Sequence, residues 1–565
     1  MDFTSKTVLG IFDASQKTFV IPVYQRAYSW DEDNWKAFYN DLKEQISGKN
    51  KYFMGNLLLE VIKKDQEYEI IDGQQRLTTI VLFIHSILDV MEKRLVRPSN
   101  GSTIKSKKRI YLENEGVVKL RPVDYDRPFF NKLISGGAQQ LKTTSPSQEL
   151  MKKAITFFTK KLQGESDGDL VGLLSKLEET EITTVELAGK RESALMFELQ
   201  NNRGKELTNM EKLKSFFMYQ TYVRSSTSEL EKNVSDLSTL FEQIYMTIKD
   251  LEHATEDNVL IYHCQAYING FSYRSIDEIK DEYRKHKSLK WINDFVCELH
   301  TSFQSIKKLE CLKSTYWKLL NQVKDGVPAF VYPFIIKAYK CFEDKTSFER
   351  FFHVMENLAF RFYLINSRAD FRSRLNELLN DLDGSTDLDS FIIKTRNKMN
   401  GTDYWSDSRL KEQLGSRLYG NSIVHYLLWR YENSLQLKGY DLKTMKIKDE
   451  SIEHISPQTP GDGEPLASGY ELEPDGGYPD DFDKYLHSIG NLLLISKSHN
   501  SSIGNSDFSS KLKSFVANPL LKQQAELERF VSGKGKTKAW DHEAIEKRTE
   551  VISAFAIRNW SFDEI

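Results

Sequence analysis

The chain has 565 residues, of which 40% are hydrophobic and 12% aromatic, so it can bury more than one substantial core. Its length predicts roughly three or four domains. The 78 Lys and Arg residues against 81 Asp and Glu residues give a formal net charge of -3. This balance excludes a global positive field as the means of attracting nucleic acid, so any contact with DNA must use local patches.

The start of the chain, Met-Asp-Phe-Thr-Ser-Lys, lacks the basic and then apolar order of a signal peptide. The longest apolar run with helical spacing, 80–91, is interrupted by polar residues and is too short to span a bilayer. The cysteines show no C-x-x-C spacing, and we expect them to be reduced thiols in the core of a cytoplasmic protein. They are Cys264, Cys297, Cys311 and Cys341. The sequence therefore predicts a soluble protein with no membrane partner.

The first elements can be placed from local signals. Segment 19–30 is expected to be extended, because Pro22 and the residue before it disfavour helix. Asp31 or Ser29 can then cap a helix that continues past residue 42. Two strands, at 52–62 and 68–71, are predicted next, joined by a polar turn.

Directly after the second strand the chain reads Asp72-Gly-Gln-Gln-Arg76, followed by a predicted helix from about 77 to 88. The free N–H groups and the dipole of that helix's first turn favour an anion, and Gly73 lets the backbone approach it. Arg76 can fork onto phosphate oxygens, and Asp72 could hold a magnesium ion or a polarised water. A tight turn with an Arg to Asp bridge explains the same residues equally well on physical grounds alone.

A basic stretch follows at 93–121. It holds nine Lys or Arg residues (93, 94, 97, 105, 107, 108, 109, 119 and 121) against Glu113 and Glu115. Such a run can contact a phosphate backbone, but a solvated surface is the more common outcome and is our expectation here.

From 209 to about 400 the spacing of apolar residues is almost entirely helical, without a repeat of fixed period, and we interpret this part as a connector. A further helix is predicted at 423–437. The later segment 458–484 is rich in Pro and Gly and has eight acidic residues against one Lys, which predicts a mobile loop.

Two stretches near the end of the chain carry a second candidate site. They read Ser-Ile-Glu-His-Ile-Ser-Pro (451–457) and Gly-Asn-Leu-Leu-Leu-Ile-Ser-Lys-Ser-His-Asn (490–500). We expect a strand that delivers Glu453 and His454 at a bend fixed by Pro457, a second strand from Asn491, and a helix from near Asn500. An imidazole that activates water, together with carboxylate and amide oxygens that hold a hard divalent cation, suits phosphodiester hydrolysis. Each piece alone is more often structural, but their order and spacing together favour a nuclease.

These residues resemble the HNH, or His-Me finger, nuclease motif. The resemblance implies that His454 is the general base, that Glu453 and Asn500 are metal ligands and that Asn491 braces the hairpin. His499 is the rival for the ligand position on the helix. Only oxygen donors are then offered, which suits Mg2+ or Mn2+ better than zinc. Many HNH nucleases clamp this hairpin with paired Cys residues, which this stretch lacks.

The continuation through Asn505, Phe508 and Lys511 resembles the nuclease half of the GmrSD-type modification-dependent restriction enzymes. Three N-terminal stretches, Pro22-Val-Tyr-Gln-Arg26, Gly55-Asn56 and Asp72-Gly-Gln-Gln-Arg76, resemble the other half of these enzymes. In that family this half is related to the ParB and sulfiredoxin fold and binds and hydrolyses nucleoside triphosphate.

Segment 197–207 resembles a later motif of the same domain. The residues that match that motif are Glu198, Asn201 or Asn202, Arg203 and Gly204, and a helix C-cap at 203–204 is the structural alternative. The resemblance thus implies a nucleotide pocket made of Gln25, Arg26, Asp72, Gly73, Gln74, Gln75, Arg76, Asn202 and Arg203.

The sequence therefore predicts a multidomain α+β protein that is predominantly helical. Its expected parts are a ParB-like nucleotide-binding domain (1–215), a helical connector (216–400) and an HNH nuclease domain (401–565). By resemblance, we expect a nucleotide-regulated, metal-dependent endonuclease with NTPase activity that cleaves modified phage DNA. The nucleotide, GTP, ATP or another, and the oligomeric state, with a homo-oligomer as one option, stay open. Two alternatives are a nucleotide switch that binds DNA or a partner with a degenerate nuclease site, and an uncoupled nicking or RNA-directed nuclease.

Overall fold

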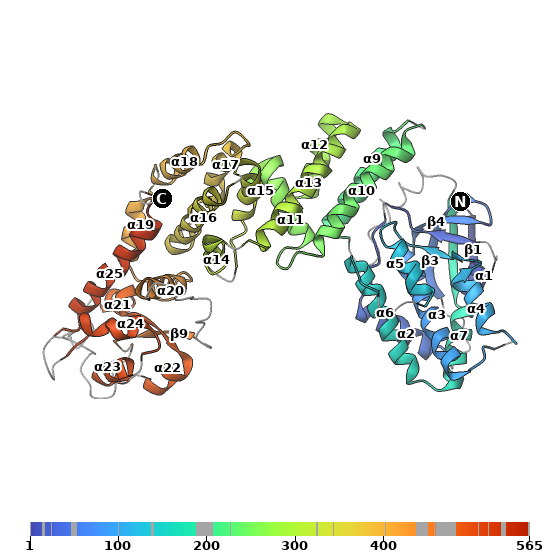
Figure 1. Cartoon of the computed structure of the whole chain (residues 1–565), viewed down its shortest axis with the longest axis horizontal. Helices are drawn as coiled ribbons and strands as arrows, with labels where there is room; N and C mark the ends of the chain where they lie inside the picture. The colour runs from blue at the N-terminus through green and yellow to red at the C-terminus, as the bar shows by residue number, and fades with distance from the viewer. Residues whose placement is uncertain are drawn as a thin grey trace. The chain divides into compact units, whose positions relative to one another are not determined.

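The computed structural model describes residues 2–13, 17–23, 25–46, 53–99, 101–136, 141–187, 207–226, 228–312, 314–323, 326–342, 344–401, 403–436, 450–456, 458, 482–504, 506, 508–517, 519–532 and 538–562. The chain forms two compact units (Figure 1). The first comprises Met1–His263 and Arg274–Glu310, and the second comprises Cys264–Tyr273 and Cys311–Ile565. The helical middle of the chain is therefore shared between the two units.

A six-stranded mixed sheet organises the first unit, with the strand order β1-β8-β3-β4-β2-β7. Strand β3 pairs antiparallel with β4 and parallel with β8, so segments far apart in the sequence meet in the middle of the sheet. The strands predicted at 52–62 and 68–71 are confirmed as β3 and β4, with small differences at their ends. The six strands are β1 (Asp2–Thr7), β2 (Thr18–Val20), β3 (Phe53–Lys63), β4 (Glu67–Asp72), β7 (Leu120–Arg121) and β8 (Glu181–Leu187).

Helix α3 (Gln74–Arg94) runs through the core of the first unit. It is longer than the helix predicted at 77–88, because its buried positions extend from Gln74 to Met91. Its residues from Ile80 to Ile84 are all fully buried, so the helix is enclosed on several sides. It packs against α4 (Ile104–Tyr111), α6 (Pro146–Gln163) and α7 (Asp167–Glu179). The remaining short elements around this core are α1 (Val8–Phe12), β5 (Glu113–Asn114), β6 (Val117–Val118) and α5 (Arg127–Ile134).

Helix α2 (Glu32–Glu44) begins at the predicted position, and Asp31 is its cap. The Asp31 side chain accepts a hydrogen bond from the N–H of Asn34, and the Asn34 side chain accepts one from the N–H of Asp31. This reciprocal pair satisfies two donors that a helix start leaves open. Ser29 instead donates its backbone N–H to Gln75, as described below.

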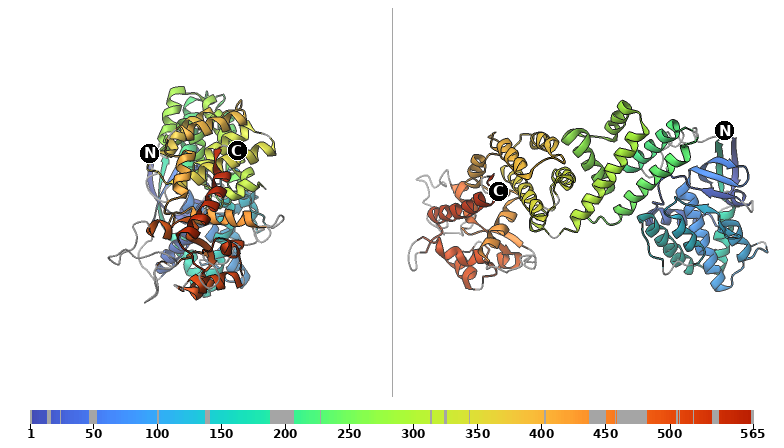
Figure 2. Two further views of the ribbon diagram at one scale, coloured as in Figure 1. Left: turned by 90° about the vertical axis from the view of Figure 1, so that its left-hand side faces the viewer. Right: turned by 45° about the horizontal axis from the view of Figure 1, so that its top comes forward.

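Helices complete the first unit after the sheet, as the spacing of apolar residues predicted. Helix α9 starts at Asn209, where Thr208 and Glu211 form a capping box. Helices α9, α10 and α13 pack side by side (Figures 1 and 2). The helices of this part are α9 (Asn209–Arg224), α10 (Leu230–Ile248), α11 (Glu256–Cys264), α12 (Ile276–His286) and α13 (Leu289–Glu310).

The second unit combines a helical layer with a small two-stranded sheet. Its helices before that sheet are η2 (Gln265–Asn269), η3 (Gly270–Ser272), α14 (Thr315–Leu320), α15 (Val331–Cys341), α16 (Lys345–Ile365), α17 (Phe371–Asp381), α18 (Leu388–Asn400), α19 (Asp407–Leu414) and α20 (Val424–Leu435). The elements that follow are β9 (Glu450–His454), α21 (Phe482–Leu486), η5 (Ile489–Asn491), β10 (Leu492–Ser496), α22 (Lys497–Ile503), α23 (Phe508–Ala517), α24 (Lys522–Ala525), η6 (Glu526–Arg529) and α25 (His542–Trp560). The helix predicted at 423–437 is confirmed as α20.

Buried polar contacts join the helical layer to α25. The guanidinium of Arg361, on α16, is fully buried and donates to the carbonyls of Trp405 at 2.8 Å and Trp560 at 2.7 Å. Glu356, one turn earlier, accepts from the indole N–H of Trp560 at 3.0 Å. Because these donors and acceptors are shielded from water, separating the two helices would leave them unsatisfied.

The cysteines only partly fit the prediction of core thiols. All four are free, but Cys264 alone is buried. Cys341 is half-buried, and Cys297 and Cys311 are exposed. Cys297 lies on an outward position of the amphipathic helix α13, and Cys311 lies just beyond its last residue, positions that the composition of the chain could not distinguish.

None of the helices in the described parts of the chain combines the length and the apolarity that a membrane crossing needs.

Candidate functional site

The second candidate site is an antiparallel hairpin of β9 and β10 followed by α22. Leu492 pairs with His454 and Leu493 with Glu453. The expected order of strand, strand and helix is confirmed, with two shifts. The second strand begins at Leu492 because residues 489–491 form a tight 3-10 turn, and the helix begins at Lys497 because Ser496 caps it. Asn500 therefore lies in the first turn of α22. Pro457 and Asn505, which the sequence analysis also named, lie outside the described residues.

Asn491 joins the parts of this hairpin from a fully buried position. Its amide oxygen accepts from the N–H of Ser456 at 2.8 Å and from the indole N–H of Trp540 at 3.1 Å. Its amide nitrogen donates to the carbonyl of Leu486 at 2.8 Å. One side chain thus ties the end of β9, the turn before β10 and the approach to α25 together.

Helix α25 closes the same turn from the other side. The buried guanidinium of Arg548 donates to the carbonyls of Gly490 at 2.9 Å and Leu492 at 2.7 Å. At Gly490, a side-chain Cβ would lie 2.1 Å from the carbonyl oxygen of Ile545, so only glycine fits this close approach of two backbones. The Gly-Asn pair of the sequence motif therefore serves the packing of the hairpin against α25.

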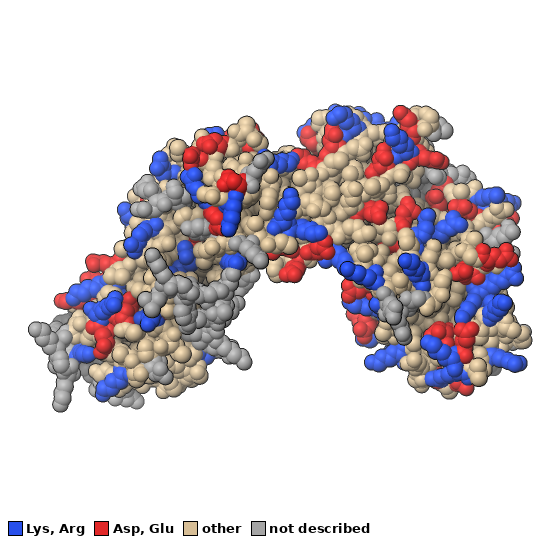
Figure 3. Space-filling model, in the orientation of Figure 1, with Lys and Arg blue, Asp and Glu red and all other residues tan. Residues whose placement is uncertain are grey.

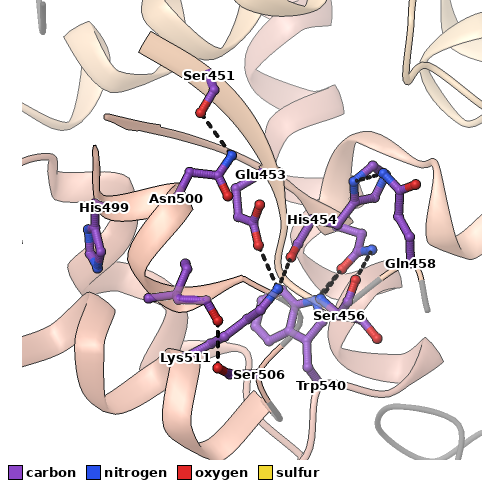
Figure 4. Close-up of polar contacts among 12 residues, drawn as sticks. Ser451, Glu453, His454, Ser456, Gln458, His499, Asn500, Ser506, Lys511 and Trp540 are labelled. Atoms are coloured by element: carbon purple, nitrogen blue, oxygen red, sulfur yellow. Dashed lines mark hydrogen bonds and ion pairs between the residues drawn. The ribbon is translucent and has the colours of Figure 1, made fainter. Parts of the chain in front are cut away.

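Glu453 forms a buried ion pair that the sequence did not predict. Its Oε1 lies 2.5 Å from Nζ of Lys511, on α23, and the same Nζ donates to the carbonyl of His454 at 3.0 Å (Figure 4). The Lys511 side chain is 1% exposed. Among the described residues, the second carboxylate oxygen of Glu453 has no further hydrogen bond. Lys511 therefore fixes the carboxylate while leaving one oxygen available.

Asn500 and His499 lie on different sides of α22. The amide nitrogen of Asn500 donates to the hydroxyl of Ser451 at 3.0 Å, and its side chain extends toward Glu453 (Figure 4). His499 instead contacts the hydroxyl of Ser514, on α23, through its Nε2 at 2.6 Å. The amide oxygen of Asn500 is therefore the helix donor on the side of Glu453.

The donors fit a hard divalent cation. Within the described parts of the chain there is no group of three or more His, Cys, Asp or Glu residues that could hold a metal ion. Glu453 and Asn500 would supply two oxygen atoms, and Mg2+ commonly accepts so few protein ligands because it keeps several waters and binds phosphate oxygens. Two oxygen donors of this kind would suit Mg2+ or Mn2+, and the identity of the cation stays a prediction from the sequence.

His454 faces away from these two donors. Its Nδ1 lies 2.7 Å from the amide nitrogen of Gln458, and its Nε2 lies 3.1 Å from Nδ1 of His487. Burial, with smaller contributions from His487 and from Lys511, lowers the pKa of His454 to about 3. The imidazole is therefore neutral at physiological pH, the state that a general base requires.

Neither His487 nor Lys511 could be assigned a role from the sequence. Lys511 appeared only as part of a family resemblance. His487 stands three residues before Gly490, outside the hairpin motif as written, and only its nearness to the Gly-Asn pair could have drawn attention to it. Both contacts join residues more than 30 positions apart, so no local pattern encodes them.

The first candidate site lies where β4 ends and α3 begins. Gly73 has the left-handed backbone (φ +94°) and α3 begins without a side-chain cap. Arg76 donates to the carbonyl of Met54 at 2.6 Å and lies 3.7 Å from Asp72, the bridge considered in the sequence analysis. At Gly55, also left-handed, a Cβ would lie 2.3 Å from the Arg76 guanidinium, so Gly55 makes room for it.

Two glutamines of the predicted pocket bind backbone. Gln25 donates to the carbonyl of Ile71 at 2.7 Å. Gln75 accepts from the N–H of Ser29 at 2.8 Å and donates to the carbonyl of Ala27 at 3.0 Å. Both side chains therefore hold segment 25–29 against the end of β4 and the start of α3.

The other predicted residues of this pocket have different surroundings. Gln74 is buried, and its amide oxygen has no hydrogen-bond partner among the described residues. Arg26 lies near Glu211 of α9, where it opposes the rise that burial causes in the pKa of that carboxyl. Asn202 and Arg203 lie outside the described residues, as does the rest of the motif around them.

The basic stretch at 93–121 is mixed with acidic residues in the structure. Lys93, Lys108 and Arg109 each pair with a nearby carboxylate. Lys107 is buried against Glu178, with 2.5 Å between the charged atoms, and Lys119 is buried as well. Over the face of the molecule shown in Figure 3, Lys and Arg side chains are interspersed with Asp and Glu side chains. These contacts agree with a largely solvated, internally paired surface.

Comparison with known families covers both candidate sites. A model described as "GmrSD restriction endonuclease, N-terminal domain" matches residues 8–218, and one described as "GmrSD restriction endonucleases, C-terminal domain" matches residues 404–555. No significant match was found among curated proteins. The first match includes the turn at Asp72–Arg76 and the second includes the hairpin, and together they take in more than half of the chain. The resemblance seen in the sequence is thereby confirmed: the chain belongs to the GmrSD restriction endonuclease family, and such an enzyme is a nuclease that acts on DNA.

Proposed function

We propose that the hairpin of the second unit is an HNH-type, metal-dependent centre that hydrolyses DNA. The observation that carries this is the placement of a neutral His454 on one side of the end of β9 and of two oxygen donors, Glu453 and Asn500, on the other. Consecutive residues of a strand point to opposite faces. Phosphoryl displacement is in line, with the attacking and leaving oxygens on opposite sides of phosphorus. A phosphate at the end of β9 would therefore meet the base on one side and the metal ligands on the other.

In this centre each side chain has a defined task. His454 removes a proton from a water, whose oxygen attacks phosphorus while the bond to the departing sugar oxygen breaks and that oxygen gains a proton. Glu453 and Asn500 would hold the cation, which supplies positive charge to the phosphate oxygens when bound. Lys511 keeps the Glu453 carboxylate in place. Asn491 keeps the end of β9 and the turn before β10 in register.

Cleavage of plasmid DNA by the purified chain tests this function. We expect cutting with Mg2+ or Mn2+, and none after chelation. A panel of modified phage DNAs and unmodified DNA, each with and without nucleotide, tests the further proposal that modified foreign DNA is the substrate. Binding of DNA or of nucleotide without cleavage under any of these conditions would favour the alternative of a switch with a degenerate centre.

We further propose that the first unit binds and hydrolyses a nucleoside triphosphate at the turn between β4 and α3. The uncapped first turn of α3 offers backbone N–H groups to an anion, and Arg76 stands beside it with partial exposure. Gln25 and Gln75 would shape this pocket through the backbone that they hold. Phosphate release measured with GTP, ATP and other triphosphates identifies the nucleotide.

The two activities are proposed to be coupled, because an unrestrained nuclease would endanger its own cell. Coupling requires that nucleotide bind two conformations unequally. We expect Arg76→Ala to abolish nucleotide turnover and to change DNA cleavage in the presence of nucleotide. His454→Ala should leave turnover largely intact. An Arg76→Ala protein that has lost turnover but cleaves DNA as the wild type does would show that the two sites work independently.

A further inference from the structure

The imidazole of His454 is held at both ring nitrogens by side chains. Gln458 places its amide nitrogen 2.7 Å from Nδ1, and His487 places its own Nδ1 3.1 Å from Nε2. Tyr419 packs against both histidines. Its ring is edge-on to His454, with 4.4 Å between the ring centroids, and stacked on His487, with 5.4 Å between the centroids. Both histidines are less than one tenth exposed.

These contacts select one tautomer of His454. The amide nitrogen of Gln458 has only hydrogens to offer, so Nδ1 of His454 must accept and carries no proton. A neutral imidazole has one N–H, which then sits on Nε2 and donates to Nδ1 of His487. A hydrogen bond to one ring nitrogen commonly decides which nitrogen carries the proton.

We propose that His487 is a positioning residue that accepts the Nε2 proton of His454, so that Nδ1 is the nitrogen that takes the proton from water. Gln458 occupies that nitrogen until the attacking water replaces it. This inference rests on the proposed function of His454 as the base. Beyond that function, it assigns Nδ1 as the reacting atom, His487 as the residue that holds the ring, and Gln458 as the side chain that water must displace.

The backbone around His487 is built to hold this contact. The N–H groups of Leu418 and Tyr419 donate to the carbonyl of His487 at 2.8 and 3.1 Å. The adjoining carbonyl, of Leu486, accepts from the buried side chain of Asn491. His487 is thus fixed by the segment after α19 and by the brace of the hairpin, which limits the freedom of its ring.

Three variants separate positioning from packing in the full-length protein. His487→Leu removes the acceptor and should lower kcat by about 10- to 100-fold, as the loss of an outer partner typically does. His487→Asn places an amide oxygen where His has Nδ1, so it should restore most of that loss. Gln458→Ala should keep or raise kcat, because the amide that it removes is displaced by water. In all three variants KM for DNA and the affinity for Mn2+ should stay near the wild-type values.

The controls distinguish this inference from the proposed function. His542→Asn, an exposed histidine of the same unit, should cut as the wild type does. If His454→Ala keeps its activity, the assignment of the base fails. If His454→Ala is inactive but His487→Leu is unimpaired, or if Leu and Asn at 487 are equally impaired, the positioning role fails and the base stands. Loss of cleavage by Gln458→Ala as deep as that of His454→Ala would overturn the displaced role of Gln458.

Imidazole 15N spectra give a readout that needs no cleavage. With 15N-labelled histidine, and with the His454 signals identified from His454→Gln, we expect the proton of His454 on Nε2. That form should persist in Gln458→Ala and give way to a mixture in the Gln458→Ala, His487→Leu double variant. A proton on Nδ1 in the wild type, or an unchanged tautomer in the double variant, would refute the inference.

Discussion

The turn at the end of β4 and the hairpin at the end of β9 use polar side chains in different ways. At the first, the charged residues stand at a rim, with the side chains of Asp72 and Arg76 exposed by 48% and 27%. At the second, Glu453 and His454 are buried, and each is held by another side chain, Lys511 or His487. The first arrangement suits a ligand that arrives with its own charge. The second suits reacting groups that must be held before the substrate arrives.

Both regions also contain amides that hold only the protein. Gln75 binds the backbone of segment 25–29, and Asn491 binds the backbone on either side of the hairpin turn. A sequence motif therefore mixes residues that react with residues that shape the site. Substitution of a reacting residue should therefore lower activity, and substitution of a shaping residue should lower stability.

The largest effect is expected at His454. His454→Ala should lower the rate of DNA cleavage by about 100-fold or more, because a positioned general base contributes that much. The protein should still fold, although the cavity left by the buried imidazole and the freed Nδ1 of His487 should lower the melting temperature. Plasmid cleavage and thermal unfolding of the same preparation measure both. If His454→Ala cleaves DNA near the wild-type rate, His454 is not the general base.

The next effect concerns stability. Asn491→Ala leaves the N–H of Ser456, the indole N–H of Trp540 and the carbonyl of Leu486 without their buried partner. We expect a loss of at least about 3 kcal/mol in the unfolding free energy of the second unit, since three groups lose their partner and each unsatisfied group costs about 1–3 kcal/mol. Hydrogen exchange of the hairpin amides locates the loss. A stable but inactive variant would instead place Asn491 among the reacting residues.

A smaller effect should distinguish the two neighbours on α22. Asn500→Ala removes the oxygen donor that faces Glu453, and we expect the Mn2+ affinity to fall roughly 10-fold, as for a lost metal contact. His499→Ala only breaks the contact with Ser514 and should leave Mn2+ binding within about 2-fold. Titration of Mn2+ by calorimetry compares the two variants. The reverse ranking would transfer the ligand role to His499.

The smallest effect is expected at Gln75. Gln75→Ala frees the N–H of Ser29 and the carbonyl of Ala27, at a cost of about 1–2 kcal/mol in the stability of the first unit. Nucleotide turnover should weaken only slightly in Gln75→Ala. Arg76→Ala should remove turnover and should lower stability less than Gln75→Ala does, because only the carbonyl of Met54 loses a partner. Unfolding and phosphate-release assays on both variants check this. Equal losses of turnover and of stability in the two variants would show that the roles of Arg76 and Gln75 cannot be separated.

Local patterns predicted much of this structure. The cap at Asp31, strands β3 and β4, and the order of β9, β10 and α22 follow from alternation, turn residues and capping signals, all of which act within a few residues. Long-range pairing was not predictable in this way. The pairing of β3 with β8 and the ion pair between Glu453 and Lys511 join residues far apart in the sequence, and no local sequence pattern indicates either.

The candidate site shows the same limit. Its residue types and spacing indicated a base and two oxygen donors, but the sides to which His454 and Glu453 point depend on where β9 ends. The partner of His454 was missed because it stands before the motif, in a turn whose conformation depends on Asn491 and Arg548.

The contact of α25 with the turn before β10 gives the hairpin an order of assembly. Residues 489–492 are synthesised before Arg548. The carbonyls of Gly490 and Leu492, which Arg548 binds, therefore lack this donor until α25 has been made. Gly490 cannot settle against Ile545 until that helix exists. A nascent chain that stops short of α25 therefore carries the reacting residues without the frame that holds them. In a cell, synthesis itself would delay the appearance of nuclease activity until the helix had docked.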